Sequence, residues 1–366
     1  VIKGPNSSLY GAGLGGSILM QSQPDFKTGV QIQSTVGSFG SWRQNAGLQW
    51  QMGKSRHRLQ LSRLRSDGWR ENNTYDRNNL LYTADRFTAR SESHTLLSYI
   101  GLNAGIPSSL NETDFLERPQ AAAANWLATQ GFEEYDRLLA GHSLSQQLGN
   151  ALTLHGSVYG NWRDSYELRP FNIAREQSFG LGSRNYLSWQ PGQAKGLEQL
   201  SLGLEYYHEW YELGLFENDN RVQGAMISDQ EQKRGFYNVF GQATIGLHKA
   251  WVAETGFNLH QTRYERQEEL DNDPAERYQT NLIFSPRLAI KYLPDARLTL
   301  YAQVAHGLSP LSPEDLNDTD GTINPEIRPE TGINYEGGCR RKAQRWYATA
   351  TLYRQDIRNL LVTERT

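Results

Sequence analysis

From about residue 28 onward, hydrophobic and polar residues alternate along the chain with a period of two. In the segment 298–305, Leu298, Leu300 and Val304 occupy one set of positions, and Thr299 and Gln303 occupy the other. Because successive side chains of a β-strand point to opposite faces, this alternation predicts strands with one apolar and one wet face. Similar patterns occur at 152–163, 251–260 and 284–292. The predicted strands, roughly 10–15 residues long, exceed the usual five or six of soluble sheets.

The connections between these strands alternate in length. Short ones are predicted near 53–55, 91–92, 148–150, 191–195, 248–250, 294–296 and 343–345. Long polar ones are predicted near 68–75, 104–134, 164–176, 213–230, 266–277 and 308–329. The first hairpin, through 37–40, is short where a long connection is due. This rhythm is typical of outer-membrane barrels, which have short periplasmic turns and long outer loops.

The count is about fifteen strands between Thr28 and Thr366, the last complete one within 346–356. An odd number does not close in the usual antiparallel way, and no terminal aromatic strand follows. In the longest connection, 111–115 and 119–128 are predicted to form two short helices outside the membrane, folded over the mouth. Asn111 suits the N-cap of the first helix, and Pro119 the first position of the second.

Composition narrows the class of protein. Hydrophobic residues make up 37%, mean hydropathy is −0.67, and no apolar run reaches the roughly 18 residues of a membrane-spanning helix. Alternating strands dilute the apolar signal, so a membrane barrel stays possible. Aromatic residues at 11% suit aromatic girdles, and a net charge of −3 argues against nucleic acid as a partner. Cys339 is the only cysteine, which excludes a disulfide framework and a zinc cluster.

The N-terminal stretch Val1–Met20 holds five glycines, a density that suggests turns or close backbone approaches. It resembles the end of the plug domain of TonB-dependent outer-membrane receptors, where the family pattern is V-x-K-G-P-x-S-x-L-Y-G followed by G-G-x-I. Further segments resemble the same family. They are Ser66-Asp-Gly-Trp-Arg-Glu-Asn72, Ser285-Pro-Arg-Leu-Ala289, Arg328-Pro-Glu-Thr-Gly-Ile-Asn-Tyr-Glu-Gly337 and Leu352-Tyr-Arg-Gln-Asp-Ile-Arg-Asn359. The loop with Phe115, Pro119 and Trp126 and the next one, 169–172, resemble the ferric-citrate-receptor branch.

The resemblance implies a fold and a division of the chain. The fold would be all-β, a transmembrane antiparallel β-barrel of 22 strands in the family, of which about fifteen are present here. Residues 1–24 would be the C-terminal end of the plug domain, and residues 25–366 a partial barrel with long extracellular loops. No signal peptide is visible in the sequence, since the residues from Val1 onward show no basic region followed by an apolar core. We therefore expect a fragment that lacks the signal peptide, the TonB box, most of the plug and about seven strands.

The resemblance also implies an activity. The protein would be an outer-membrane receptor, not an enzyme, that imports a ferric siderophore or ferric citrate using energy delivered by TonB and its inner-membrane complex. Iron would enter only within a bound chelate, so no resident cofactor is expected. The expected partners are TonB, the ferric chelate and outer-membrane lipid, and the receptor is expected to be monomeric.

Ligand contacts are expected from the outer loops, since only these meet the environment. Arginine forks match carboxylates, and aromatic rings stack on flat chelators. The candidates are Trp69, Arg70, Arg118, Arg163, Tyr166, Arg169, Phe171, Tyr207 and Tyr211. A loop arginine can equally be solvated or paired with a nearby acid such as Glu167. The plug motif comprises Lys3, Gly4, Pro5, Tyr10, Gly11, Gly15 and Gly16, whose glycines either shape an inner site or form tight turns in a small sheet.

No resident metal site is expected. The eight histidines lack metal-binding spacing. The acidic run from Glu314 to Asp320 places Glu326 at the twelfth position counted from Asp315, as in an EF-hand, but Gly321 arrives one residue late. This run is interpreted as a solvated loop.

Three other classes compete with the energised receptor. A passive porin or sugar channel would share the alternation but lack the segment Val1–Met20. An outer-membrane enzyme would need a nucleophile beside a base, and no such arrangement stands out in the sequence. A soluble carbohydrate-binding β protein would have no need of long lipid-facing strands.

Overall fold

A computed structural model describes residues 2–5, 8–9, 11, 13–19, 26–192, 196–270, 274–312, 314–316 and 323–362. Sixteen strands form one antiparallel sheet, and fifteen of them follow one another from β3 to β18. The short strand β14 lies off this path and pairs with β13. The prediction of about fifteen barrel strands is therefore confirmed in the described residues. None of the described helices has the length and apolarity to cross a membrane.

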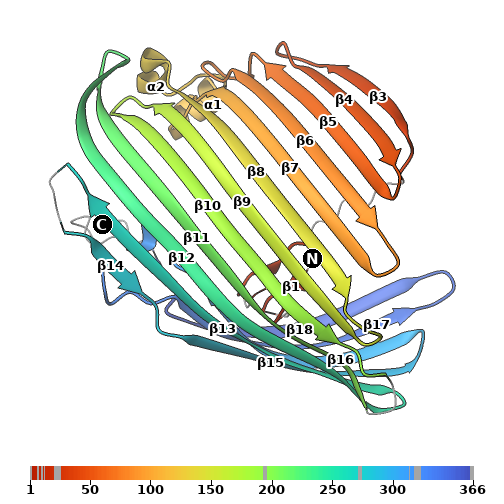
Figure 1. Cartoon of the computed structure of the whole chain (residues 1–366). Coiled ribbons are helices and arrows are strands. Elements are labelled where there is room, and N and C mark those ends of the chain that lie inside the picture. Colours follow the sequence, from red (N-terminus) through yellow and green to blue (C-terminus); the bar gives the residue numbers. More distant parts are fainter. Residues whose placement is uncertain are drawn as a thin grey trace.

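The strands of the large sheet are β3 Gly29–Val36, β4 Trp42–Met52, β5 Ser55–Ser66, β6 Tyr75–Phe87, β7 Ser91–Gly105, β8 Phe132–Gln147, β9 Leu152–Leu168, β10 Ile173–Trp189, β11 Leu197–Asp219, β12 Val222–His248, β13 Trp251–Glu268, β14 Glu276–Gln279, β15 Ile283–Asp295, β16 Leu298–Ser309, β17 Glu330–Lys342 and β18 Tyr347–Arg358. Two helices, α1 Glu112–Glu117 and α2 Ala124–Thr129, lie in the connection from β7 to β8, and the 3-10 turn Glu314–Leu316 follows β16. The sheet curves into an open barrel wall, with α1 and α2 at the end that carries the long connections (Figure 1).

Burial is inverted relative to a soluble protein. Leu202 and Leu204 on β11 are more than half exposed, whereas Ser201 on the other face of that strand is 1% exposed. Asn258 and Ser285, directly opposite each other on β13 and β15, are also buried. The apolar rows therefore face outward and the polar rows face the concave side. This is the arrangement of a membrane barrel and not of two sheets packed on an apolar core.

The N-terminal segment lies on the concave side of the sheet. Its strands β1 Ile2–Lys3 and β2 Gly16–Ser17 form a separate two-stranded sheet. The backbone N–H of Leu14 donates to the carbonyl of Leu308 on β16 (3.1 Å), and Gln355 on β18 donates to the carbonyl of Leu14 (3.4 Å). A Cβ atom on Gly256 of β13 would lie 2.3 Å from the Ser8 hydroxyl. The face of the sheet that carries Gly256 therefore faces the N-terminal segment, and we call this side the lumen. On each strand it is formed by every second residue.

Two predicted long connections are wrong. At 164–176, β9 and β10 remain paired up to Leu168 and Ile173, leaving four residues between them. At 213–230, β11 and β12 extend to a two-residue turn at Asn220 and Arg221, which both have positive φ angles (51° and 76°). The polar composition of these segments suggested loops. The strands nevertheless stay paired beyond the apolar band, because the pairing is made by backbone hydrogen bonds and does not require apolar side chains.

The helices agree with the sequence in part. Asn111 caps α1 as expected, since its side chain accepts a hydrogen bond from the Asp114 N–H at 2.8 Å. The predicted role of Pro119 is wrong. Helix α2 begins at Ala124, because residues 118–121 form a turn in which Ala121 N–H donates to the Arg118 carbonyl.

Candidate functional site

A cavity of about 460 Å³ separates the N-terminal segment from the lumen wall. Gly11 and Gly13 line it on one side, and β11, β12, β13 and the end of β16 line it on the other. The wall residues come together because antiparallel pairing places them in cross-strand rows. Glu209 lies opposite Arg234, and Arg234 opposite Tyr264. The adjacent row on the same face, two residues along each strand, holds Tyr207, Phe236 and Thr262.

An ion pair forms the upper wall of this cavity. The Arg234 guanidinium donates through Nε to the Glu209 carboxylate, which is only 6% exposed. Arg234 also lies over the Tyr211 ring, 5.9 Å from its centroid. A carboxylate that is buried this far requires its cation, because an unpaired buried charge is costly. The pair therefore fixes two polar side chains at the edge of the cavity.

His260 lies in a hydrogen-bonded chain on the same wall. Its Nδ1 contacts Asn238 Oδ1 at 2.6 Å, and its Nε2 contacts Thr262 Oγ1 at 2.7 Å. The Asn238 amide donates in turn to Glu205 (3.2 Å), which pairs with Arg184 (3.0 Å). With both ring nitrogens engaged, His260 positions its neighbours and has no nitrogen available for a metal ion. Among the described residues, no group of three or more His, Cys, Asp or Glu side chains is placed to hold a metal.

Aromatic rings lie flat along the wall between β9 and β11. Tyr159 and Tyr207 stack with centroids 6.2 Å apart and planes at 14°. Tyr207 donates to Asn161 Oδ1 at 3.0 Å and packs against Phe236. The strand between them, β10, presents Gly180 and Gly182 to the two rings. The wall beside the cavity therefore offers flat apolar surface with fixed polar atoms at its edges, which suits a bound small molecule.

Three of the predicted ligand residues share this lumen wall: Arg163, Tyr207 and Tyr211. Arg163 pairs with Glu133 (2.9 Å) and Glu176 (3.4 Å), so its charge is already compensated. Arg169 follows the end of β9 and pairs with Glu167 at 2.5 Å. The hydrogen bond to that carboxylate raises the pKa of the Arg169 guanidinium above its ordinary value.

The remaining predicted ligand residues are dispersed. Trp69 is half-exposed in the connection after β5. Arg118 pairs with Asp114 at the end of α1. Tyr166 lies on the face of β9 opposite Arg163, where the Arg175 guanidinium lies 5.4 Å from its ring centroid. Phe171 is 66% exposed in the turn between β9 and β10.

Arg70 holds two loops together. Its guanidinium donates to the carbonyls of Ala121 (2.8 Å and 3.0 Å) and Ser108 (2.8 Å) in the long connection that carries α1 and α2. Asn72 donates to the carbonyls of Ile106 and Gly131 in the same connection. The geometry supports a structural use of Arg70, and a contact with ligand stays a prediction for it, as for the other eight.

Sequence reasoning missed Glu209, Arg234, Asn238 and His260. A signal for them existed in β11, where Glu205, Tyr207, Glu209 and Tyr211 alternate with Leu204, Tyr206, His208 and Trp210. The polar set of this alternation is the lumen face. Its partners on β12 and β13 could not be identified without the strand register.

The plug-motif residues lie mostly in the described N-terminal segment. Lys3 pairs with Gly16 across β1 and β2, and Pro5 is buried. Gly4, Gly11 and Gly16 have positive φ angles of 63°, 83° and 102°, which favour glycine. Gly15 precedes β2 in a turn, and Tyr10 lies outside the described residues, as do residues 317–320 of the acidic run.

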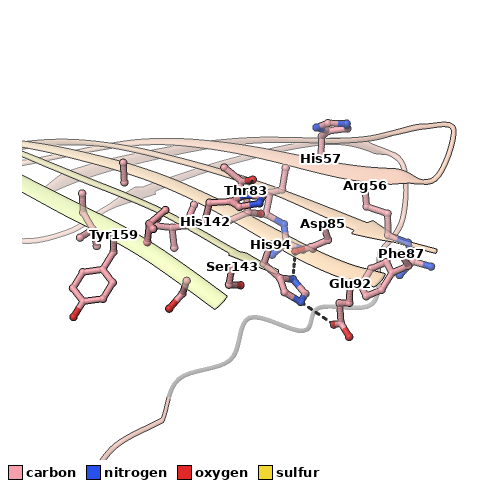
Figure 2. A pocket seen from close by; sticks show the side chains of 18 of the residues that line it. Arg56, His57, Thr83, Asp85, Phe87, Glu92, His94, His142, Ser143 and Tyr159 are labelled. Atoms are coloured by element: carbon pink, nitrogen blue, oxygen red, sulfur yellow. Dashed lines mark hydrogen bonds and ion pairs between the residues drawn. The ribbon is translucent and has the colours of Figure 1, made fainter. Parts of the chain in front are cut away.

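A second cavity, of about 700 Å³, lies on the lumen side near the short turns of β5 to β9. His94 on β7 lines it, and its Nδ1 contacts Asp85 (2.7 Å) and its Nε2 contacts Glu92 (2.8 Å). Figure 2 shows both carboxylates beside the ring, and His57 on the opposite face of the sheet. The Arg56 guanidinium lies between the rings of Phe26 and Phe87, 5.5 Å and 5.6 Å from their centroids.

Comparisons with known proteins agree with this architecture. Residues 63–366 match the family described as TonB dependent receptor-like, beta-barrel. No curated protein sequence matches the chain.

Solved structures share the fold at low sequence identity. The copper transporter OprC is 14% identical with a TM-score of 0.76, the match covering 97% of this chain and 58% of that one. The ferric citrate transporter FecA is 14% identical with a TM-score of 0.72, covering 88% and 50%. The alcaligin outer membrane receptor FauA from Bordetella pertussis is 15% identical with a TM-score of 0.69, covering 93% and 53%. The chain thus spans 50% to 58% of the length of these three proteins.

Proposed function

Because the chain belongs to the TonB-dependent receptor family, whose members are receptors and transporters and not enzymes, we propose that it is part of a receptor that imports a ferric chelate across the bacterial outer membrane with energy from TonB. Residues 1–24 would be the end of the plug domain and residues 25–366 a partial transmembrane barrel. The short connections would face the periplasm, and α1 and α2 the outside. Iron would arrive within its chelate, with no resident cofactor.

One observation carries the proposal: the N-terminal segment lies inside the curved sheet and forms, with the lumen wall, a cavity. A passive channel has no need of a segment that occupies its lumen. In a receptor, such a segment closes the pore and must move before a ligand can pass.

The cargo is proposed on chemical grounds. Tyr207, Phe236 and Tyr264 offer aromatic surface beside the Glu209–Arg234 pair, which suits a ferric siderophore or ferric citrate with flat faces and oxygen donors. The similar structures bear names that mention ferric citrate, alcaligin and copper. The cargo therefore requires direct measurement.

Uptake by cells that carry the complete gene tests the proposal. Radiolabelled ferric citrate, a ferric hydroxamate, a ferric catecholate and copper are supplied to cells with and without functional TonB. We expect one ferric chelate to accumulate only when TonB and the proton-motive force are intact. Equal uptake without TonB would overturn the energised mechanism, and uptake of copper alone would overturn the cargo.

Variants on one strand test the site. Tyr207→Ala removes a lumen ring and is expected to weaken chelate binding roughly three- to tenfold, from the worth of one aromatic contact. Tyr206→Ala is the matched control, because Tyr206 is the preceding residue of β11 and lies on the outward face. Equal affinity of the two variants would contradict the placement of the ligand at this wall.

A further inference from the structure

The barrel end formed by the short connections carries a concentrated positive charge. Within seven short connections and the two strand residues on each side of them, the described residues include nine basic and three acidic side chains. The whole chain has a net charge of −3. The basic residues are Lys54, Arg56, Arg86, Arg90, Lys249, Arg297, Arg341, Lys342 and Arg345, and the acidic ones are Glu92, Glu198 and Asp295.

Seven of these nine basic side chains form an exposed set that we call the basic rim. Arg56, which lies near two phenylalanine rings, and Lys342 are excluded because both lie on the lumen face of their strands. In the part of the chain that the structure describes, no ion pair involves any of the seven. The nearby Asp295 carboxylate is occupied by the backbone N–H groups of Arg297 (2.7 Å) and Leu298 (3.0 Å).

Four basic side chains on the lumen wall, unlike those of the basic rim, form ion pairs. Arg163, Arg184, Arg234 and Arg287 each pair with a glutamate at the wall. The charges of these four arginines are therefore compensated within the chain, whereas those of the basic rim remain for a partner outside it.

Aromatic side chains set the depth of the basic rim in a membrane. Trp50, Trp189, Trp251 and Trp346 lie at or next to the short connections, and Trp251 packs against Tyr292 with centroids 4.7 Å apart. Tryptophan and tyrosine girdles lie at the level of lipid headgroups. The Arg341 guanidinium lies 6.0 Å from the Trp346 ring centroid, so the basic rim and the girdle occupy the same level.

We propose that the basic rim binds the phosphate groups of anionic phospholipids in the periplasmic leaflet of the outer membrane. The occupant is identified by charge complementarity at headgroup depth: exposed cations beside a tryptophan girdle meet lipid phosphates before they meet anything else. The inference rests on the proposed orientation of the barrel and on no feature of its cargo. The basic rim would hold the barrel at a fixed depth and enrich anionic lipid around it.

Lipid selectivity in bilayers tests this inference. The complete receptor is reconstituted with phosphatidylcholine, and spin-labelled phosphatidylglycerol or phosphatidylcholine reports the motionally restricted shell. We expect phosphatidylglycerol to associate roughly threefold or more strongly at low salt, since each basic residue near an anionic surface contributes, with a loss of preference at high salt. Equal association of the two lipids with the wild-type receptor overturns the inference.

Charge-reversal variants locate the effect. The triple variant Lys249→Glu, Arg297→Glu, Arg345→Glu is expected to abolish the preference. The control Arg221→Glu, Arg277→Glu, Arg328→Glu makes the same charge change at exposed positions of the other barrel end and is expected to retain it. A glutamine version of the triple variant, checked for folding by its heat-dependent gel mobility, replaces any variant that misfolds.

The outcomes separate the two proposals. A barrel that inserts and transports but shows no lipid preference overturns the basic-rim inference alone. Binding of the receptor to isolated peptidoglycan through the basic rim, without lipid preference, would also overturn it and assign the surface to the cell wall. Failure to insert into any bilayer would overturn the proposed function itself.

Discussion

At the residue scale, two glycines on β10 determine how the tyrosines lie on the lumen wall. A Cβ atom on Gly182 would lie 2.3 Å from the Tyr159 ring, and one on Gly180 would lie 2.3 Å from the Tyr207 hydroxyl. Neither glycine has a positive φ angle, so the requirement is for space and not for backbone conformation. The stacked rings next to the cavity therefore depend on the absence of side chains beneath them.

Gly182→Ala is expected to displace the Tyr159 ring and to destabilise the barrel by about 1–3 kcal/mol, as overpacking does elsewhere. Thermal unfolding of the purified receptor, followed by gel mobility, measures the effect. Gly149→Ala is the control, because no heavy atom lies within 4 Å of a Cβ atom built there. Equal midpoints for the two variants would contradict the close fit.

Residue pattern identified part of the candidate site. Alternation correctly separates the lumen face of β11 from its outward face, so the positions of Tyr207 and Tyr211 on one face follow from the sequence. The pairing of Glu209 with Arg234 does not, because it joins residues 25 positions apart through a strand register that hydrophobicity alone leaves undetermined. The ligand residues predicted from loops lie far apart in the structure, because the composition of a loop does not show where its side chains point.

At the element scale, the connection with α1 and α2 is fastened to the connection between β5 and β6. Besides Arg70 and Asn72, Glu71 joins the two, through its N–H to the Gln120 carbonyl (2.8 Å) and its carboxylate to the Ala122 N–H (3.2 Å). Short helices without buried residues have little stability of their own. These contacts therefore make the connection a fixed part of the barrel mouth.

Arg70→Ala removes the charged donors of this fastening. Hydrogen bonds from a charged group contribute about 1.5–3 kcal/mol each, so hydrogen exchange in residues 106–131 should accelerate roughly tenfold or more. Exchange mass spectrometry of the intact receptor measures it. Arg221→Ala, at the exposed tip of the β11–β12 hairpin, serves as the control, and an unchanged exchange rate in Arg70→Ala would contradict the clamp.

The first turn of α1 is expected to depend on pH. The hydrogen bond from Arg118, with help from Asn111, lowers the pKa of the Asp114 carboxyl below its ordinary value. A lowered pKa in the folded state stabilises the helix above the ordinary pKa, and that stabilisation is lost as pH falls through the lowered value. Exchange protection factors of α1 should therefore fall at strongly acidic pH. Asp114→Asn should lack this dependence, and the same acid response in that variant would refute the explanation.

Element existence was largely predictable from the sequence, and element ends were not. Period-two alternation located the strands because each has one face against lipid and one against polar surroundings. The predicted ends of β9, β10, β11 and β12 were wrong because the parts of these strands beyond the apolar band are polar and have the composition of loops. The prediction of Asn111 as an N-cap was correct, since a cap is a local hydrogen bond. The prediction of Pro119 as the first helical residue was wrong, because the turn at Pro119 depends on contacts with another loop.

At the scale of the whole molecule, the described sheet has two outer edges, β3 and β18. Both expose large apolar side chains, including Ile32 at 79% and Leu352 at 84%. Within the described residues, the outer backbone edges of these strands have no strand partner. Unpaired edges invite pairing with another chain.

A polypeptide limited to residues 1–366 is accordingly expected to self-associate after refolding in detergent. Light scattering coupled to size-exclusion chromatography measures its mass. The product of the complete gene, handled identically, provides the control and should be monomeric. A monodisperse monomer from the 366-residue polypeptide would show that its two edges find each other.

The attachment of the N-terminal segment has a mechanical consequence. Its backbone joins the wall at Leu14, whose N–H donates to the Leu308 carbonyl in an isolated parallel bridge and whose carbonyl accepts from the Gln355 side chain. Loaded through one end of the chain, such contacts rupture in sequence, each for about 1 kcal/mol, and not all together as in a sheared sheet. A small force sustained over distance would therefore separate the segment from the wall one contact at a time, while the surrounding strands stay paired.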